Sequence, residues 1–286
     1  MLDDIYHILL SYGLITGSTL LTHKVNFYSN VNGFFSIENN KFVQVKVAIE
    51  KSLENEYKGL TDHNKVKQVI IPKVICFCER NGYKYLVVEG VSHQMISSEL
   101  ITAKENVISG QLLKYFSEIS YLTNETDCQS IEKIFSDCSK KYSNDIHEVK
   151  PWIKEKKYEL FNRIARRPQH CDFTINNIAF QSNRIVIFDW EDYGEVDIEG
   201  FDIVIFICSI CEFKVEKLQM LWSNEKSPYT KLLIAFFEQY EISMSDLWSL
   251  LPGYLLLFYQ LKCELGYSNK IRGLSKNLIS KIISCS

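Results

Sequence analysis

Four polar residues near the middle of the chain have the types and spacing needed for metal-assisted chemistry. His170, Asp172 and Asn177 lie in one predicted loop, and Asp189 ends the apolar strand that follows. A short hairpin returns this strand, so we expect Asp189 to emerge beside the loop. Two carboxylates and an amide oxygen suit a hard cation, and one of the carboxylates could instead orient or deprotonate a hydroxyl group.

Each of these residues also has an ordinary structural interpretation. Asp172 could cap a turn, Asn177 could bond to its own backbone, and Asp189 could simply end a strand. Considered one at a time, the residues do not decide between structure and chemistry. The elements around them must therefore be considered.

The first ninety residues are predicted to form strands with one intervening helix. Alternating apolar residues and turn residues predict these strands, with a hairpin at Asn81-Gly82, a turn at 29–32, a turn at Asn39-Asn40 and a helix over 50–60. The strands are expected at 24–29, 33–38, 42–48, 74–79 and 83–89. The pattern indicates an antiparallel sheet with one helix in a domain of residues 1–91.

After Gly90 the apolar residues recur at helical spacing. Helices are expected at 112–122, at 153–165 and from Phe201 to the end. A hairpin of 177–181 and 184–190 is expected between the second and the third of these regions. The polar stretch 124–144 is expected to form a surface loop. The sequence thus predicts an α+β protein whose second domain, 92–286, is mainly helical.

The spacing His-x-Asp-x4-Asn, followed by an apolar strand that ends in Asp-Trp-Glu, resembles a known family. It is similar to the aminoglycoside phosphotransferase and choline/ethanolamine kinase superfamily, which has a protein-kinase-like bilobal fold. The resemblance implies that Asp172 is the catalytic base and that Asn177 and Asp189 ligate Mg²⁺. It also implies that His170 and Asp202 brace the loop. Cys171 and Asn176 depart from the pattern, because glycine is common at both positions.

A kinase of this type also needs a lysine that binds the nucleotide phosphates and a carboxylate that holds this lysine. Lys46 lies on the polar face of the strand 42–48, and Glu56 is spaced to share one helix face with Leu53 and Leu60. We prefer Glu56 to its neighbouring glutamates because Glu-Tyr-Lys-Gly-Leu resembles the family's Glu-x-x-x-Leu. The ordinary alternative for the two residues is a solvated surface pair.

The resemblance also implies a nucleotide site between the two predicted domains. Residues 86–91 resemble the strand that leads into the adenine hinge, so ATP is expected to place its adenine against the backbone near Glu89 and Val91. The phosphate loop departs from the protein-kinase form, because a single glycine, Gly33, follows Ser29 in this turn. A backbone nest around Ser29 and Gly33 is the candidate for phosphate binding.

The substrate is indicated only by class. Asp189-Trp190-Glu191-Asp192-Tyr193-Gly resembles choline and ethanolamine kinases, although Asp192 stands where these enzymes carry tyrosine. Acidic residues here could attract an ammonium group, and Trp190 and Tyr193, with Trp222 and Tyr229, could form an aromatic cage. The ordinary alternatives are a solvated acidic loop and an apolar core.

Composition limits the other possible functions. The chain has 286 residues, with 32 Lys+Arg against 35 Asp+Glu, so it lacks the basic surface expected of a nucleic-acid partner. No apolar run reaches the ~18 residues of a membrane span, and the acidic start is unlike a secretory signal. Nine cysteines without a framework pattern indicate reduced thiols. These features predict a cytoplasmic protein and leave its oligomeric state open.

The sequence therefore predicts an ATP- and Mg²⁺-dependent phosphotransferase that acts on a hydroxyl of a small molecule. A choline- or ethanolamine-like amino alcohol and an aminoglycoside are the substrates favoured by the resemblance. The alternatives are a kinase for a sugar or glycan precursor and a catalytically silent kinase-like binding protein. Protein-kinase activity is disfavoured, because Asp189 is followed by Trp-Glu and no Ala-Pro-Glu occurs.

Overall fold

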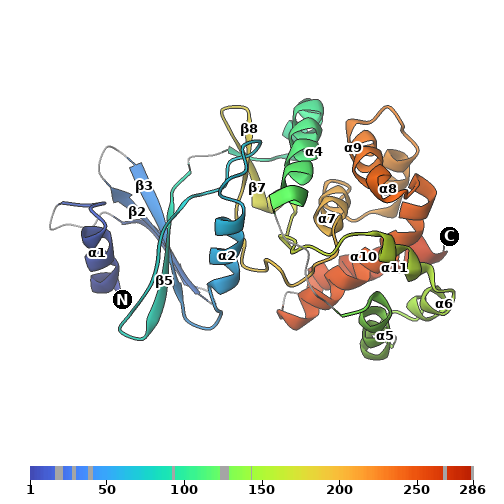
Figure 1. The fold of residues 1–286 in the computed structure, drawn as a ribbon, viewed down its shortest axis with the longest axis horizontal. Coiled ribbons are helices and arrows are strands. Elements are labelled where there is room, and N and C mark those ends of the chain that lie inside the picture. Colours follow the sequence, from blue (N-terminus) through green and yellow to red (C-terminus); the bar gives the residue numbers. More distant parts are fainter. Residues whose placement is uncertain are drawn as a thin grey trace.

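A five-stranded antiparallel sheet forms the first lobe of the protein (Figure 1). The computed structural model describes residues 1–16, 22–27, 30–37, 41–91, 94–122, 129–142, 144–266 and 269–284. The strand order is β1-β2-β3-β5-β4, and every neighbouring pair is antiparallel. The strands are β1 (Thr22–Phe27), β2 (Asn30–Ile37), β3 (Lys41–Ala48), β4 (Val74–Arg80) and β5 (Tyr83–Glu89).

Two helices cover opposite faces of this sheet (Figure 1). The alternation in β3 buries Val43, Val45 and Val47 against α1 (Leu2–Ser11). It turns Lys46 toward the other face, which α2 (Glu54–Asp62) covers. The predicted hairpin is present, because Asn81 and Gly82 both adopt positive φ angles of 50° and 78°. The sequence predicted one helix in this lobe, and α1 is the second.

The second lobe is mainly helical and contains a small sheet of order β6-β7-β8. Its strands are β6 (Gln94–Met95), β7 (Ile178–Gln181) and β8 (Arg184–Ile187). Its α-helices are α3 (Ser98–Ala103), α4 (Glu105–Leu122), α5 (Ile131–Tyr142), α6 (Val149–Lys154), α7 (Phe201–Ile210), α8 (Val215–Trp222), α9 (Pro228–Phe237), α10 (Met244–Glu264) and α11 (Asn269–Ser284). Among the described residues, short 3₁₀ helices lie at Lys157–Arg163, Ile175–Asn177 and Glu238–Tyr240.

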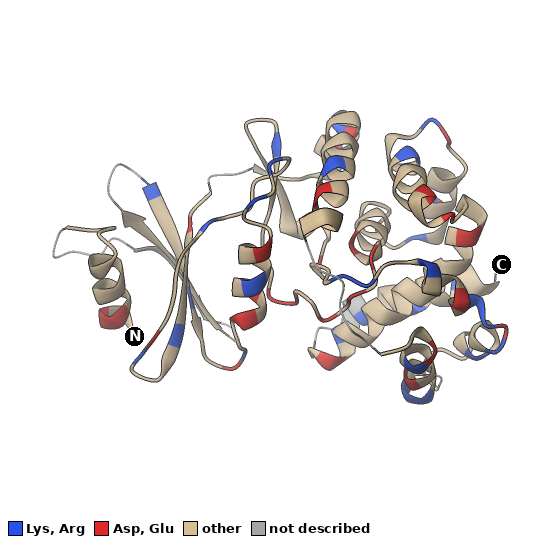
Figure 2. Cartoon of the chain, viewed as in Figure 1, with Lys and Arg blue, Asp and Glu red and all other residues tan. Residues whose placement is uncertain are grey.

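The long helix α10 crosses this lobe and carries few charges (Figure 2). Most of its residues from Leu247 to Lys262 are buried, and α7 is buried along almost its whole length. Among the described helices, none is long and apolar enough to cross a membrane. The predicted α+β, protein-kinase-like bilobal fold is confirmed.

Three local predictions are wrong. The polar stretch 124–144 is not a loop throughout, because its second half forms α5, which buries Ile131 and Phe135 on one face. The helix expected over 153–165 is broken, since α6 ends at Lys154 and a 3₁₀ helix follows. The turn expected at 29–32 is displaced, because Asn30 begins β2; Ser29 and Asn39-Asn40 lie outside the described residues.

Glycine at position 59 allows the two lobes to approach closely. A Cβ atom on Gly59 would lie 2.7 Å from the ring of Trp190 and 2.9 Å from that of Tyr193. His63, one turn further along α2, completes the contact, with its ring centroid 4.5 Å from that of Trp190. The segment after β8 therefore packs directly on the helix that carries Glu56.

His63 is expected to make the stability of the protein depend on pH. Its side chain is buried, its Nδ1 lies 2.9 Å from the carbonyl oxygen of Gly59, and burial lowers its pKa from 6.5 to about 4. As the pH falls below 6.5, the unfolded chain therefore takes up a proton that the folded chain refuses. By pH 5 this difference lowers the free energy of unfolding by about 2 kcal/mol.

The measurement is a comparison of wild type with His63→Asn by urea unfolding at pH 7.5 and pH 5. Glu56 and Asp202 have carboxyl pKa values raised to about 7, so the folded protein loses stability as the pH rises toward 7. This effect of pH on the free energy of unfolding is opposite to that of His63. The two carboxyl groups are common to both proteins, so the difference in pH dependence isolates His63. Equal losses on acidification would show that folded His63 is readily protonated.

Candidate active site

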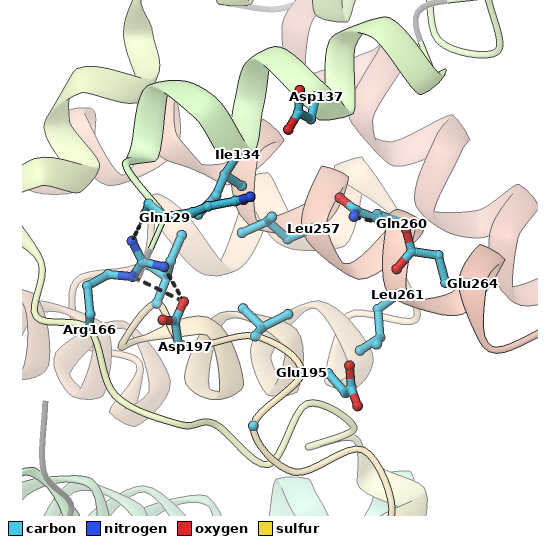
Figure 3. A pocket seen from close by; sticks show the side chains of 13 residues that line it. Gln129, Ile134, Asp137, Arg166, Glu195, Asp197, Leu257, Gln260, Leu261 and Glu264 are labelled. Atoms are coloured by element: carbon cyan, nitrogen blue, oxygen red, sulfur yellow. Dashed lines mark hydrogen bonds and ion pairs between the residues drawn. The ribbon is translucent and has the colours of Figure 1, made fainter. Parts of the chain in front are cut away.

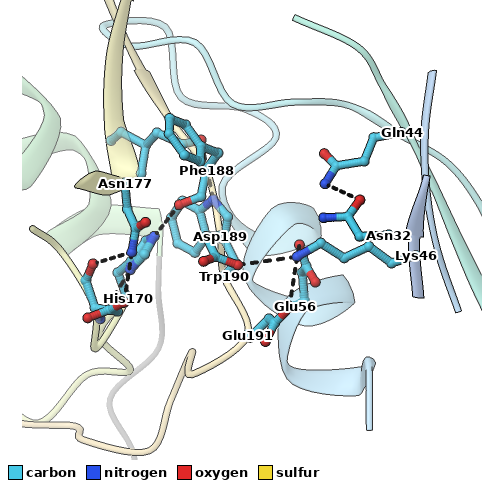
Figure 4. Close-up of polar contacts among 12 residues, drawn as sticks. Asn32, Gln44, Lys46, Glu56, His170, Asn177, Phe188, Asp189, Trp190 and Glu191 are labelled. Carbon is cyan, nitrogen blue, oxygen red and sulfur yellow. Dashed lines mark hydrogen bonds and ion pairs between the residues drawn. The ribbon is translucent and has the colours of Figure 1, made fainter. Parts of the chain in front are cut away.

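A buried lysine joins the two lobes at the base of the sheet (Figure 4). The Nζ atom of Lys46 lies 2.9 Å from Glu56 Oε1, 3.2 Å from Asp189 Oδ1 and 3.0 Å from Glu191 Oε1. Burial lowers the pKa of Lys46, but the three carboxylates more than offset this, and the net shift is upward. Lys46 therefore stays charged and can bind phosphate oxygens. The structure brings it together with Glu56, the partner predicted from the sequence, and also with Asp189.

Glu56 is the partner of Lys46, whereas Glu54 forms an exposed pair with Lys84. Burial raises the pKa of Glu56 to about 7, although Lys46 opposes this shift. Its Oε2 atom is buried and has no hydrogen-bond partner among the described residues. One carboxylate oxygen of Glu56 thus holds Lys46, and the other is buried without a protein partner among the described residues.

A cavity of about 280 Å³ lies between the sheet and the second lobe. Four of the residues predicted to bind ATP line this cavity, namely Lys46, Glu56, Glu89 and Val91. Its full lining is Asn32, Phe34, Gln44, Lys46, Glu56, Leu60, Pro72, Val88, Glu89, Gly90, Val91, Val186, Phe188 and Asp189. Gly33 is paired within β2, between two lining residues, and Ser29, the other residue of the predicted nest, lies outside the described residues. We call this space the interlobe cavity.

His170 and Asp202 fix the loop that carries the predicted base. The carboxylate of Asp202 accepts the backbone N–H groups of His170 and Cys171, at 2.7 and 2.9 Å. The His170 ring accepts the Asp172 N–H at Nδ1 (3.3 Å), so Nε2 carries the proton and donates to the carbonyl of Phe188 (3.1 Å). Burial lowers the pKa of His170 to about 4, so the ring stays neutral at pH 7 and can make both of these hydrogen bonds.

Asp172 and Asn177 lie in direct contact. The Nδ2 atom of Asn177 donates to the Asp172 carbonyl and to its Oδ2, both at 2.8 Å. This leaves the amide oxygen of Asn177 as the atom that can ligate a cation. The side chain of Asp172 is 20% exposed, so a hydroxyl group can reach it.

Cys171 occupies a backbone conformation that favours glycine. Its φ angle is 70°, and its buried sulfur accepts the Val196 N–H at 3.1 Å. A non-glycine residue in this region costs about 1 kcal/mol or more. This explains why the resemblance leads one to expect glycine here.

Two substitutions at this position are expected to differ in stability. Cys171→Gly relieves the backbone but loses buried contacts, so the free energy of unfolding should change by less than about 1 kcal/mol. Cys171→Val adds a β-branched side chain at positive φ and should cost about 2 kcal/mol or more. Urea unfolding of the three proteins measures this difference. A valine variant as stable as wild type would contradict the left-handed backbone.

The donor set suits Mg²⁺ bound together with nucleotide phosphates. Asp189 has a side chain 44% exposed and supplies a carboxylate, and Asn177 supplies an amide oxygen. No group of three or more His, Cys, Asp or Glu side chains forms a metal cage within the described ranges. Mg²⁺ commonly uses one or two protein ligands and completes its shell with water and phosphate. The residues therefore fit a nucleotide-bound Mg²⁺.

Lys262, which was not among the residues predicted from the sequence, reaches the predicted base from α10. Its Nζ atom lies 2.8 Å from Asp172 Oδ1 and 3.1 Å from Asp192 Oδ2. The signal that could have identified it is a single lysine within a long apolar helix. This pairing also corrects the substrate prediction for Asp192, which is buried and bound to Lys262. Glu191 is likewise paired, with Lys46.

The aromatic cage proposed from the sequence is not formed. Trp190 and Tyr193 are 0% and 2% exposed and pack in the core against α2. Trp222 packs instead against Trp248, with ring centroids 5.3 Å apart. These aromatic side chains contribute to the core, so the prediction that Trp190 and Tyr193 contact substrate is wrong.

A second cavity, of about 450 Å³, lies in the helical lobe (Figure 3). Its walls come from α5, α10 and residues 194–198, and we call it the helical-lobe cavity. It is lined by Gln129, Ile134, Asp137, Arg166, Gly194, Glu195, Val196, Asp197, Ile198, Leu257, Gln260, Leu261 and Glu264. The lining contains four acidic side chains and one basic side chain, Arg166. Arg166 donates a hydrogen bond to Asp197 at 3.1 Å.

Solved structures match this chain over nearly its whole length. Aminoglycoside phosphotransferase APH(4)-Ia, in a complex with ADP and hygromycin B, has a TM-score of 0.59 at 11% identity, covering 98% of this chain and 97% of its own. The chain has the fold of a small-molecule kinase. This fold confirms the predicted structural resemblance to the aminoglycoside phosphotransferase and choline kinase superfamily.

Two further kinases match equally well. Ethanolamine kinase from Plasmodium vivax has a TM-score of 0.61 at 14% identity, with 98% of this chain and 87% of that chain covered. Amicoumacin kinase, in complex with AMP-PNP, Ca²⁺ and its ligand, has a TM-score of 0.57 at 12% identity, with 99% and 94% covered. No protein-family model matches the sequence, and no curated protein matches it significantly.

Proposed function

We propose that the protein is an ATP- and Mg²⁺-dependent phosphotransferase that phosphorylates a hydroxyl group of a small molecule. The observation that carries the proposal is the meeting of two sets of residues from distant parts of the chain. Lys46 of the first lobe, paired with Glu56, contacts Asp189 of the second lobe, and all three residues line one interlobe cavity. Asp172, held by His170 and Asn177, lies on the loop beside it.

In this proposal residues 1–91 bind the nucleotide and residues 92–286 carry the base and the acceptor. Lys46 binds phosphate oxygens, and Asn177 and Asp189 hold Mg²⁺, which neutralises the charge of the phosphates when bound. Asp172 accepts the proton of the acceptor hydroxyl as its oxygen bonds to the γ-phosphorus. The bond to the bridging β–γ oxygen breaks, and ADP leaves with the electron pair.

We place the acceptor between Asp172 and the helical-lobe cavity. Two lining residues, Gly194 and Leu261, are close neighbours in sequence of Asp192 and Lys262, which connect to the base. Asp137 and Glu264 pair with Lys140 and Lys141, whereas Glu195 accepts a hydrogen bond from the neutral Asn55. The carboxylate of Glu195 therefore favours a cationic acceptor such as an amino alcohol or an aminoglycoside. Hygromycin B and ethanolamine, the compounds in the names of two matching structures, are suitable first candidates.

The test is an ATP-consumption screen over amino alcohols, aminoglycosides and sugars, run with and without Mg²⁺. We expect Mg²⁺-dependent ADP release that increases with one of the amine-bearing classes. Turnover with neutral sugars alone would favour a sugar or glycan-precursor kinase. Binding of Mg·ATP without turnover on any compound would favour the catalytically silent binding protein.

A further inference from the structure

Lys262 is the single basic residue of α10, and its side chain is only 1% exposed. A charged lysine in the interior is costly unless carboxylates pair with it. Burial lowers the pKa of Lys262, but Asp172 and Asp192 more than offset this, and the net pKa is raised. Lys262 is therefore a cation held within the second lobe. Its Nζ atom also lies 5.3 Å from the centre of the Phe258 ring.

The contact to Asp172 completes the fixation of that carboxylate. Lys262 Nζ lies 2.8 Å from Oδ1, while Asn177 donates to Oδ2 at 2.8 Å. The loop from His170 to Asn177 contains no lysine or arginine, so the cation that pairs with the Asp172 carboxylate comes from α10. Because each oxygen has its own partner, the Asp172 carboxylate has a defined orientation.

The contact to Asp192 anchors the lysine itself. Asp192 is 3% exposed and lies three residues after Asp189, on the segment that also carries Glu191. The ammonium group has three N–H donors, so its contact with Asp192 leaves donors for a second partner. Lys262 extends to the partly exposed Asp172 as well. One ammonium group thus connects the base to the segment that carries the proposed metal ligand.

We propose that Lys262 is a positioning residue for phosphoryl transfer, whose ammonium holds the Asp172 carboxylate in the orientation that receives the acceptor proton. The proposal rests on the function proposed above. Correct orientation of a base affects the chemical step and not the affinity for nucleotide. Loss of Lys262 should therefore lower kcat with little change in the KM for ATP.

The test needs a variant that removes Lys262 without leaving a buried charge. Lys262→Met alone strands Asp192 and is expected to lower the melting temperature or prevent folding. Lys262→Met/Asp192→Asn removes both charges while keeping the side-chain volumes, and it frees Asp172 from its cation. Lys281→Met, which removes an exposed lysine from its pair with Glu216, is the matched control.

Three readouts are measured on wild type and these variants. They are the melting temperature, its rise with Mg·ATP, and single-turnover transfer from γ-labelled ATP to water, ethanolamine, choline, hygromycin B or glucose. We expect the double variant to fold, to keep the rise with Mg·ATP, and to lose about 10²-fold in transfer rate. The KM for ATP should change by less than about threefold, and Lys281→Met should match wild type.

The possible contrary results are distinguishable. Transfer by the double variant at the wild-type rate would overturn the role of Lys262 and leave the proposed function intact. Loss of Mg·ATP binding together with transfer would also overturn it, because the lysine would then support the whole site. If wild type itself binds no Mg·ATP or transfers no label to any probe, the proposed function fails, and the role of Lys262 fails with it.

Discussion

Asp172→Asn is expected to lower the single-turnover rate of phosphate transfer by about 10²–10⁴-fold while Mg·ATP binding stays nearly normal. Asparagine preserves the size of the side chain but cannot accept the acceptor proton. Asp172 does not line the interlobe cavity, so nucleotide affinity has little dependence on it. Rapid quench of γ-labelled ATP with the accepted substrate measures the rate, and the rise in melting temperature with Mg·ATP measures binding.

Asp189→Asn provides the matched comparison within the same site. Asp189 lines the interlobe cavity and contacts Lys46, so its loss should reduce Mg²⁺-dependent nucleotide binding as well as turnover. The two variants therefore separate proton transfer from metal binding. Near-wild-type transfer by Asp172→Asn would show that the base predicted from the resemblance does not act at this position.

Lys46→Met is expected to abolish most of the stabilisation of the protein by Mg·ATP. A ligand present at 100 times its dissociation constant stabilises the folded state by about 2.7 kcal/mol, and this gain depends on the phosphate contacts of Lys46. The substitution also leaves Glu56 buried without its cation, so the unliganded variant will melt at a different temperature. The informative quantity is the rise on adding Mg·ATP, measured by differential scanning fluorimetry.

Lys84→Met is the control for Lys46, because Lys84 forms an exposed pair with Glu54 on the adjoining strand and helix. It should keep the full rise in melting temperature with Mg·ATP. The assignment of Lys46 would be contradicted by an undiminished rise in Lys46→Met. An equal loss in both variants would indicate a general effect of removing lysines from this lobe.

The parts of the site that follow local sequence rules could be predicted. The alternation of β3 places Lys46 opposite Val45 and Val47, and helical spacing places Glu56 with Leu60. The fold then brings these residues together as expected from the pattern. Asn81 and Gly82 likewise determine a hairpin through their tolerance of positive φ, which is a property of these residue types alone.

The features that depend on distant parts of the chain were missed. Trp190 and Tyr193 have the types of substrate-binding residues, but they are buried, and their rings pack closely against Gly59 of α2, which lies far away in the sequence. Lys262 is separated from Asp172 by ninety residues of sequence, as the numbering shows, and their contact depends on how α10 crosses the lobe.

Helix α1 illustrates the same limit in the first lobe. Its buried apolar residues are Ile5, Ile8 and Leu9, and the helix is held by packing on the sheet and by Asp4, which accepts a hydrogen bond from Tyr85 at 2.9 Å. Tertiary packing of this kind stabilises short helices more than intrinsic propensity does. Contacts of this kind join residues about eighty positions apart, which a local pattern does not contain.

The most direct test of the proposed function is to follow the γ-phosphate itself. Wild-type protein is incubated with γ-labelled ATP, Mg²⁺ and each compound of the amine-bearing and sugar panels, and the products are separated from ATP and inorganic phosphate. We predict that the label appears on a hydroxyl of one small molecule, that EDTA prevents the transfer, and that Asp172→Asn reduces it by about 10²-fold or more. Recovery of the label in ATP alone, from a protein shown to bind Mg·ATP, would contradict a phosphotransferase.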